Sequence, residues 1–370
     1  MDRAAPARVM LTTDSVGGVW RYCLDLATGF VARGAAVTVV VMGPPANDAQ
    51  RAEARICGVD LVETALPLDW LAEDAGALEQ AARALAGLAR ELGADSVQVH
   101  SPAYATGADW NVPVVAMAHS CVGTWWRAVR GDLPLPPDLA WRVDCVAHGM
   151  HAADAVIAPS AAFAAMLHET YGDGHAIIAI PNGRRTAPLP RDAQPHAFTA
   201  GRLWDDAKNV ALLDEAAAML EQPVRAAGPL RGPNGAQIDC RRLHLLGVLD
   251  DVQLACEYAQ ASVFVSPARY EPFGLAVLEA AQAGAALVLS DIPTFRDLWD
   301  GAAMFVDPND PAALALLLRR LLPSRRRCSA LGVAARARAA TYSAERMAAE
   351  TWDVHCNLWR ARETRARCAA

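Results

Sequence analysis

The alternation of short apolar runs with helical patterns constrains the fold of this chain more than any other feature. Strands that alternate with amphipathic helices are typical of parallel sheets joined by crossover helices. The first half predicts strands at 8–12, 37–42, 60–62, 96–100, 114–117, 155–158 and 177–180, and the second half at 197–200, 224–227, 243–246, 262–265, 286–289 and 303–306. We therefore predict an α/β protein built from Rossmann-like parallel sheets.

The length of the chain predicts two domains, because 370 residues exceed what one hydrophobic core usually supports. Prolines and polar residues interrupt the pattern between Pro181 and Pro195, so we place one domain at 1–185 and the other at 186–342. The final segment, 343–370, reads as a helix that packs on another element. The side chains that form its packing stripe are Met347, Thr351, Trp352, His355, Leu358 and Trp359.

Charge and cysteine usage exclude several classes of protein. The formal net charge of -7 argues against a general nucleic-acid binder, which would carry a basic face. The nine cysteines are scattered singly, without Cys-x-x-Cys pairs or histidines at metal-ligand spacing, so we expect no metal site. A reduced, cytoplasmic location is the simpler interpretation. The amino terminus leads into a strand rather than a signal-peptide core, and no apolar run approaches about 18 residues.

The segment after the strand at 262–265 predicts an anion site. Proline fits the first helical position because its missing N–H would be unpaired there, so Pro272 predicts a helix start with Glu271 just ahead of it. The first amides of such a helix are free and lie at its positive end, where they bind anions. In this interpretation those amides belong to Phe273, Gly274 and Leu275.

A second carboxylate, Glu279, follows eight residues after Glu271. On a continuous helix the two lie about 80° apart, so both can face one cleft. The alternative for Glu271 is a surface residue that stabilises the helix dipole by ~0.3 to 1 kcal/mol. That alternative suits Glu279 less well, because its neighbours are apolar and a buried carboxylate needs hydrogen-bond donors. Ligand hydroxyls would supply them.

The distribution of cations marks one further element. Of the 34 lysine and arginine residues one is a lysine, Lys208, which follows Arg202 closely after the strand at 197–200. A compact ammonium and a planar guanidinium together suit a diphosphate. The alternative is that Lys208 pairs with Asp205 and Asp206 on an exposed face, where such pairs stabilise by only ~0 to 1 kcal/mol.

Three features of the first half predict ligand contacts. Gly17 and Gly18 form a turn after the first strand, but the pattern is not Gly-x-Gly-x-x-Gly, which argues against a dinucleotide-dependent oxidoreductase. His119 follows the strand at 114–117, at the sheet edge where α/β proteins bind ligands, although a lone histidine is otherwise more often structural. It opens a predicted polar loop, 120–127.

That loop carries Trp125, Trp126 and Arg127. These side chains are candidates to stack on a sugar or to bind an acidic acceptor. They are equally compatible with packing, or with a weak membrane-surface contact made together with Arg130.

Taken together, the glycine turn, the Arg202–Lys208 element and the two glutamates resemble the retaining glycosyltransferases of family 4, which have the GT-B fold. The resemblance extends from about Arg8 to Trp359. It implies two Rossmann-like domains facing a central cleft, an acceptor-side domain followed by a donor-binding one, and a last helix that crosses back to the first domain.

The resemblance also implies the roles of single residues. Glu271 and His119 would contact the donor sugar and Glu279 the ribose hydroxyls, while Arg202 and Lys208 would bind the diphosphate. Gly17 and Gly18 would approach that diphosphate from the first domain. The remaining donor-binding positions would be Leu246, Gly247, Pro272, Phe273, Gly274 and Leu275. Ser120 stands where many relatives have aspartate.

The expected activity is transfer of a hexosyl group from a nucleotide diphosphate sugar to an acceptor hydroxyl with retention of configuration. We expect no cofactor and no metal, since the chain has no Asp-x-Asp motif. The acceptor is a small molecule, a glycan or a lipid-linked compound, and the oligomeric state stays open. A nucleotide-sugar epimerase, or an inactive nucleotide-sugar binding protein on the same fold, is the alternative. A glycan phosphorylase would need a pyridoxal-binding lysine, and the sole lysine is already assigned.

Overall fold

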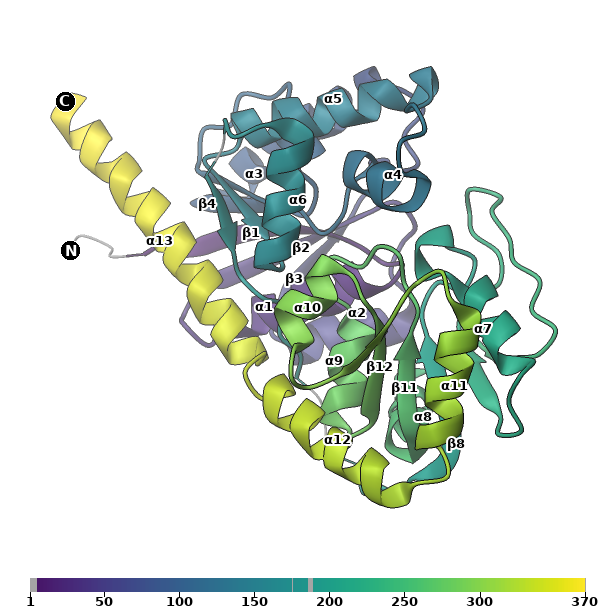
Figure 1. Ribbon diagram of the computed structural model, residues 1–370. Coiled ribbons are helices and arrows are strands. Elements are labelled where there is room, and N and C mark those ends of the chain that lie inside the picture. Colours follow the sequence, from purple (N-terminus) through teal and green to yellow (C-terminus); the bar gives the residue numbers. More distant parts are fainter. Residues whose placement is uncertain (1–4, 175, 186–188, 370) are drawn as a thin grey trace. The chain divides into compact units, whose positions relative to one another are not determined.

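A computed structural model describes residues 5–174, 176–185 and 189–369 (Figure 1). Every strand that the sequence predicts is present, with ends displaced by a few residues, and all strand pairings between neighbours in the two sheets are parallel. The α/β prediction is therefore confirmed. The chain forms two compact units, the first comprising residues up to 127, 132–183 and from 344 onward, the second 128–131 and 184–343.

The first unit is built on a seven-stranded sheet with the strand order β3-β2-β1-β4-β5-β6-β7. Its strands are β1 (Arg8–Asp14), β2 (Ala36–Met42), β3 (Asp60–Glu63), β4 (Ser96–Val99), β5 (Val114–Met117), β6 (Ala155–Ala158) and β7 (Ile177–Ala179). Its helices are α1 (Gly18–Val31), α2 (Asp48–Ile56), α3 (Ala75–Glu91), η1 (Pro102–Ala105), α5 (Pro137–Ala152), α6 (Ala161–Tyr171) and α13 (Ala344–Ala369), and α4 (Val122–Arg130) begins in it. The inner strands are buried, which explains their continuous apolar runs.

The last helix, α13, packs on α1 of the first unit. A Cβ on Gly29 of α1 would lie 2.2 Å from the Cβ of Ala348, so glycine permits the two helices to approach closely. The ring of Phe30 meets that of Trp352 edge-on, with centroids 4.9 Å apart. Met347, Thr351, Trp352 and His355 are buried, which confirms that the stripe read from the sequence is a packing face.

The second unit is built on a six-stranded sheet with the order β10-β9-β8-β11-β12-β13. Its strands are β8 (Gln194–Ala200), β9 (Val224–Ala227), β10 (His244–Gly247), β11 (Ala261–Ser266), β12 (Ala286–Ser290) and β13 (Met304–Val306). Its helices are η2 (Asp206–Lys208), α7 (Val210–Ala217), α8 (Asp251–Gln260), α9 (Leu275–Gln282), α10 (Pro293–Trp299), α11 (Pro311–Leu321) and α12 (Arg325–Ala339). One apolar cluster packs α9, α10 and α12 on this sheet, and another packs α7 and α11.

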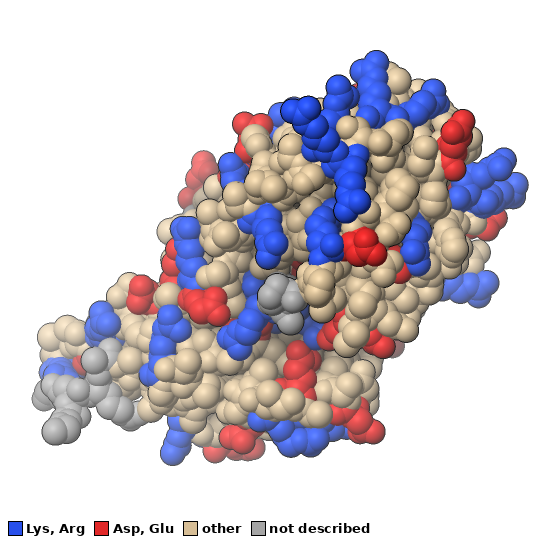
Figure 2. Space-filling model, turned by 90° about the horizontal axis from the view of Figure 1, so that it is seen from below, with Lys and Arg blue, Asp and Glu red and all other residues tan. Residues whose placement is uncertain are grey.

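Acidic and basic side chains both occur across the face of the molecule seen in Figure 2, in line with the small formal net charge of -7. Within the described part of the chain, no helix combines the length and the apolar character that crossing a bilayer requires.

Candidate active site

The loop before α9 differs from the one that the sequence predicts. The helix begins at Leu275, with Gly274 as its N-cap in a left-handed conformation (φ 89°), so the prediction that Pro272 occupies the first helical position is wrong. The cause is Phe273, which is buried in the core and meets the ring of Tyr342 edge-on at 5.7 Å. This anchor holds the preceding residues in a loop, and glycine supplies the reversed backbone.

The shifted helix start changes two predictions about its surroundings. The amides that the helix leaves unpaired are those of Leu275, Ala276 and Val277, rather than those of residues 273–275. Glu271 lies outside the helix. The predicted angle between Glu271 and Glu279 assumed that both lie on one continuous helix, so this prediction is also wrong.

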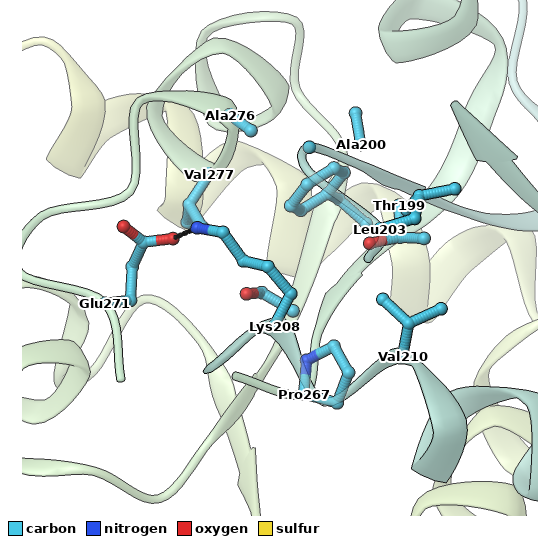
Figure 3. A pocket seen from close by; sticks show the side chains of 12 residues that line it. Thr199, Ala200, Leu203, Lys208, Val210, Pro267, Glu271, Ala276 and Val277 are labelled. Carbon is cyan, nitrogen blue, oxygen red and sulfur yellow. Dashed lines mark hydrogen bonds and ion pairs between the residues drawn. The ribbon is translucent and has the colours of Figure 1, made fainter. Parts of the chain in front are cut away.

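Glu271 and Lys208 form an ion pair in the second unit (Figure 3). The Lys208 ammonium donates to a carboxylate oxygen of Glu271, and the two side chains are only 22% and 15% exposed. The alternative in which Lys208 pairs with Asp205 or Asp206 on an exposed face is therefore wrong, because Lys208 pairs with Glu271 and the pair is largely withdrawn from water.

The pair lies in a pocket at the carboxyl ends of β8 and β11, beside the first turn of α9 (Figure 3). The residues that line it are Thr199, Ala200, Gly201, Leu203, Lys208, Val210, Phe264, Ser266, Pro267, Glu271, Ala276 and Val277. The carboxyl ends of parallel strands are where open α/β sheets bind ligands. A polar pair on apolar walls suits a ligand with a charged part.

Several contacts fix the backbone on either side of Lys208. Asp205 caps η2 by accepting from the Ala207 amide at 3.0 Å. Asn209, in a left-handed conformation, donates its side-chain amide to the carbonyls of Pro267 and Pro308 at 2.9 and 2.8 Å. The lysine therefore leaves the backbone at a point that is tied to the loops after β11 and β13.

Arg202 occupies a different position from the one predicted beside Lys208. Its guanidinium pairs with Asp205 at 3.0 Å and lies over the Trp204 ring, with its carbon 5.8 Å from the ring centroid. The side chain is half exposed and is not among the residues that line the pocket. The structure thus brings Lys208 and Glu271 together, while Arg202 lies on the adjoining loop.

The carboxyl ends of β8, β9 and β10 lie in a row beside this pocket. The Gly201 amide donates to the Ala227 carbonyl at 3.0 Å, and the Gly228 amide donates to the Gly247 carbonyl at 2.8 Å. A Cβ on Gly228 would lie only 1.8 Å from the Gly201 carbonyl oxygen, so these loops touch through backbone atoms. Leu246 and Gly247, two of the predicted donor-binding residues, end the outer strand of this row.

Glu279 has a partner that the sequence analysis missed. Its Oε1 accepts from the Nε of Arg184 at 2.8 Å, and the two side chains are 16% and 13% exposed. Burial and the nearby charge of Glu279 raise the pKa of Tyr258 well above its ordinary value. A protein donor therefore meets part of the need for hydrogen bonds that the sequence analysis assigned to ligand hydroxyls alone.

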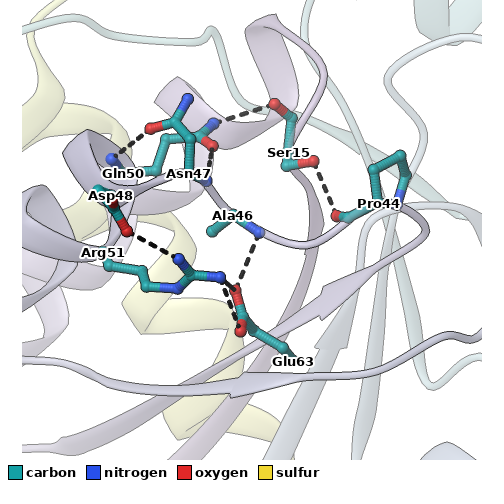
Figure 4. A network of polar contacts seen from close by, with 8 residues as sticks. All are labelled: Ser15, Pro44, Ala46, Asn47, Asp48, Gln50, Arg51 and Glu63. Atoms are coloured by element: carbon teal, nitrogen blue, oxygen red, sulfur yellow. Dashed lines mark hydrogen bonds and ion pairs between the residues drawn. The ribbon is translucent and has the colours of Figure 1, made fainter.

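In the first unit, the glycine turn after β1 is braced by its neighbours (Figure 4). The Ser15 hydroxyl donates to the Pro44 carbonyl at 2.9 Å, and the Gln50 side chain donates to the Ser15 carbonyl at 2.9 Å. Gly17 is the N-cap of α1 with φ 130°, and Gly18 is the first helical residue. The predicted strand–turn–helix arrangement around these two glycines is confirmed.

His119 follows β5 at the carboxyl edge of the sheet, as the sequence predicts. Its ring lies edge-on to those of Tyr22 and His100, with centroids 4.6 and 5.2 Å apart. Desolvation lowers the pKa of His119 to about 3. Its Nε2 is buried and has no hydrogen-bond partner among the described residues. The imidazole is therefore neutral at ordinary pH and keeps one polar atom free.

A chain of buried polar side chains leads from α13 to His100, whose ring lies against that of His119. The Ser96 hydroxyl lies 2.7 Å from Nδ1 of His355, whose Nε2 donates to Oε1 of Gln98 at 3.1 Å. The Gln98 amide nitrogen lies 3.1 Å from Nε2 of His100, which accepts from it. Burial, followed by the charges of neighbouring histidines, lowers the pKa of His100 well below its ordinary value. Sequence reasoning missed His100, although His100 ends a predicted strand at the same edge of the sheet as His119.

The segment predicted as a polar loop at 120–127 is helical from Val122, where α4 begins, so that prediction is wrong. Trp126 donates its indole N–H to the Leu133 carbonyl at 2.8 Å. Arg127 donates to the Thr170 hydroxyl at 3.2 Å and lies 3.6 Å from the Glu169 carboxylate. The rings of Trp125 and Trp126 are tilted, with centroids 6.3 Å apart. Arg127 is thus engaged with α6.

Comparison with known proteins matches most of the chain. The family model described as Glycosyltransferase Family 4 matches residues 16–187, and the one described as Glycosyl transferases group 1 matches residues 194–324. A D-inositol 3-phosphate glycosyltransferase from Xylanimonas cellulosilytica is 28% identical over 95% of this chain and 94% of its own length. The O-antigen chain mannosyltransferase B of Escherichia coli is 37% identical over 20% of this chain and 19% of its own length.

Solved structures agree on the fold. The sucrose-phosphate synthase of Thermosynechococcus elongatus superimposes with a TM-score of 0.77 at 20% identity, covering 96% of this chain and 99% of that one. The Anabaena protein HepE, solved in complex with UDP and glucose, gives a TM-score of 0.69 at 16% identity, covering 94% of this chain and 99% of that one. These matches extend through both units, each built on a parallel sheet. The chain therefore belongs to the family 4 glycosyltransferases, enzymes of the GT-B fold.

Proposed function

We propose that this glycosyltransferase moves a hexosyl group from a nucleoside diphosphate sugar to an acceptor hydroxyl, with retention of configuration and without a metal. The observation that carries the proposal is the Lys208–Glu271 pair in the pocket at the carboxyl ends of β8 and β11. Negative charge grows on the diphosphate as the glycosidic bond stretches. A cation held in advance near that charge stabilises the transition state more than the ground state.

In this proposal, residues in and around the pocket bind different parts of the donor. Lys208 faces the diphosphate, helped by the free amides at the start of α9, and Glu271 accepts from hydroxyls of the transferred sugar. Arg202 joins the diphosphate when it turns from Asp205, which its half-exposed position permits. Glu279 takes the ribose hydroxyls, and Leu246 with Gly247 lies against the base.

The remaining assignments concern the first unit. We infer that residues 1–185, together with the helix at 343–370, form the acceptor-side domain, and that residues 186–342 form the donor-binding domain. His119 would contact the donor sugar through its free Nε2 as a neutral group, and Gly17 and Gly18 would approach the diphosphate. Trp125 and Trp126 would line the acceptor side. Among the described residues no cysteine is joined to another in a disulfide, which is consistent with a reducing cytoplasm.

A screen of donors and acceptors tests the proposal. UDP-, GDP- and ADP-linked hexoses are first tested by thermal shift, since a ligand at 100 times its dissociation constant stabilises by about 2.7 kcal/mol. The donor that binds is then offered D-inositol 3-phosphate, because a relative is named for that acceptor, along with simple glycosides and lipid-linked sugars. Anomeric configuration is read by proton NMR.

Each outcome bears on one part of the proposal. Transfer that continues in EDTA and keeps the anomeric configuration supports it. An inverted product would contradict retention, and loss of turnover in EDTA would contradict metal independence. Interconversion of donors without acceptor would indicate the epimerase, and binding without transfer or slow donor hydrolysis would indicate an inactive binding protein.

A further inference from the structure

Two of the places where the chain passes between the units lie next to each other in the second unit. Arg184 is the first residue of the long segment 184–343 of the second unit, directly after Gly183 of the first unit, and Ser343 is the last residue of that segment, just before α13. The backbones of Arg184 and Ser343 form a parallel β-bridge. A contact that the Arg184 side chain makes inside the second unit therefore also holds this bridge in place. We call the bridge between Arg184 and Ser343 the crossing point.

Arg184 binds α9 at two points. Its guanidinium Nε donates to Oε1 of Glu279 at 2.8 Å, and its carbonyl accepts from the side-chain amide of Gln282 at 3.1 Å. Glu279 and Gln282 are three residues apart and therefore share one face of the helix. Since both partners of the ion pair are less than one-fifth exposed, Glu279 is held by a contact that water competes with only weakly.

The geometry leaves part of Glu279 available. A carboxylate can accept about four hydrogen bonds, and the Arg184 Nε uses one of them. The planar guanidinium restricts the direction of the carboxylate more than an ammonium would, since its donors are fixed in one plane. A carboxylate aimed in advance accepts from ligand hydroxyls without first losing its own rotational freedom.

We propose that Arg184 is a positioning residue that orients Glu279 to accept both ribose hydroxyls of a nucleoside diphosphate. The inference rests on the proposed role of Glu279 in nucleotide binding. It assigns a task to a residue of the connecting segment, which the sequence pattern marks only as a boundary between domains. Arg184 thereby links recognition of the ribose to the crossing point formed with Ser343.

Discrimination between ribose and its deoxy form tests this role. Dissociation constants of ADP, GDP and UDP, and of their 2′,3′-dideoxy counterparts, are measured by calorimetry with the full-length protein. The variants are R184Q, E279A and, as a matched control, R185Q, which alters the exposed neighbouring arginine. R184M, which keeps the aliphatic stem, replaces R184Q if that variant does not fold by circular dichroism.

For the best-bound nucleotide, the wild type and R185Q should prefer the ribose form by at least about tenfold, as expected for hydrogen bonds to a charged group. In R184Q the preference should fall to about twofold or less, with the dideoxy form bound nearly as before. Equal weakening of both forms in R184Q would reduce Arg184 to a structural residue and overturn the inference, as would an unchanged preference. If E279A keeps the wild-type preference, the assignment of Glu279 itself fails, and the inference fails with it. If E279A loses the preference while R184Q keeps it, only the role of Arg184 is refuted.

Discussion

Replacing His355 by glutamine should change how the stability of the protein depends on pH. The imidazole is fully buried between Ser96 and Gln98, and desolvation lowers its pKa from 6.5 to about 3. The unfolded chain therefore binds a proton that the folded chain rejects wherever the pH lies between these two values. Because the unfolded state binds more protons there, the free energy of unfolding falls as the pH falls below about 6.5.

The size of the effect follows from the two pKa values. Between about pH 7.5 and about pH 5, a histidine with these values lowers the free energy of unfolding by about 2 kcal/mol. His355→Gln removes this contribution while His100 and His119 still titrate, so their effects cancel in the comparison. The variant should be less stable than the wild type at pH 7.5, and the difference should shrink by about 2 kcal/mol at pH 5.

Urea unfolding followed by circular dichroism and tryptophan fluorescence, at several pH values, measures this difference. Because the chain has two units, the curves are fitted with one or two transitions, and the one that responds to the substitution is compared. His151→Gln, at an exposed position of the same unit, serves as the control and should follow the wild type at every pH. Parallel loss of stability in wild type and His355→Gln would refute the reasoning.

Three further predictions concern the candidate site. Lys208→Ala should lower the turnover of the folded protein about 100-fold, measured by steady-state kinetics, because it removes one preorganised charge; near-wild-type rates would exclude Lys208 from the mechanism. Gly228→Ala should abolish nucleotide binding and lower the melting temperature, since its Cβ would lie 1.8 Å from the Gly201 carbonyl oxygen; Gly235→Ala, with a positive φ but nothing within 4 Å, isolates the backbone strain alone. With the pKa of His119 at about 3, the rate profile between about pH 5.5 and about pH 8 should contain no inflection that His119→Asn removes.

The strands were predictable because buried parallel strands are short apolar runs that local sequence alone defines. The start of α9 was not, since the preference of proline for the first helical turn is small and the burial of Phe273 outweighs it. α4 was missed for a similar reason. Its glycine and small polar residues favour a turn, but the segment is helical and packs closely on α6 at Gly123, where a Cβ would lie 2.8 Å from the Tyr171 hydroxyl.

The polar partners of the site lie beyond what one sequence reveals. A carboxylate in apolar surroundings predicts that a donor exists, but Arg184 is 95 residues from Glu279, and many other arginines were equally eligible. The contact between Ser96 and His355 spans 259 residues. Local patterns identify which buried residue needs a hydrogen-bond partner, while the tertiary fold determines which residue that partner is.

The two carboxylates of the candidate site each hold a cation before any ligand arrives, and this arrangement bears on how a donor would bind. Leaving one of these charges half-buried and unpaired would destabilise the protein, so pairing makes a permanent pocket possible. The pairs need not break when a donor enters. An ammonium has three N–H donors, so Lys208 can keep Glu271 and still reach a phosphate oxygen, and the Arg184 Nε uses only part of the accepting capacity of Glu279. Binding then adds contacts to charges that are already desolvated and oriented, which is the condition under which they act most strongly on the charge developing in the transition state.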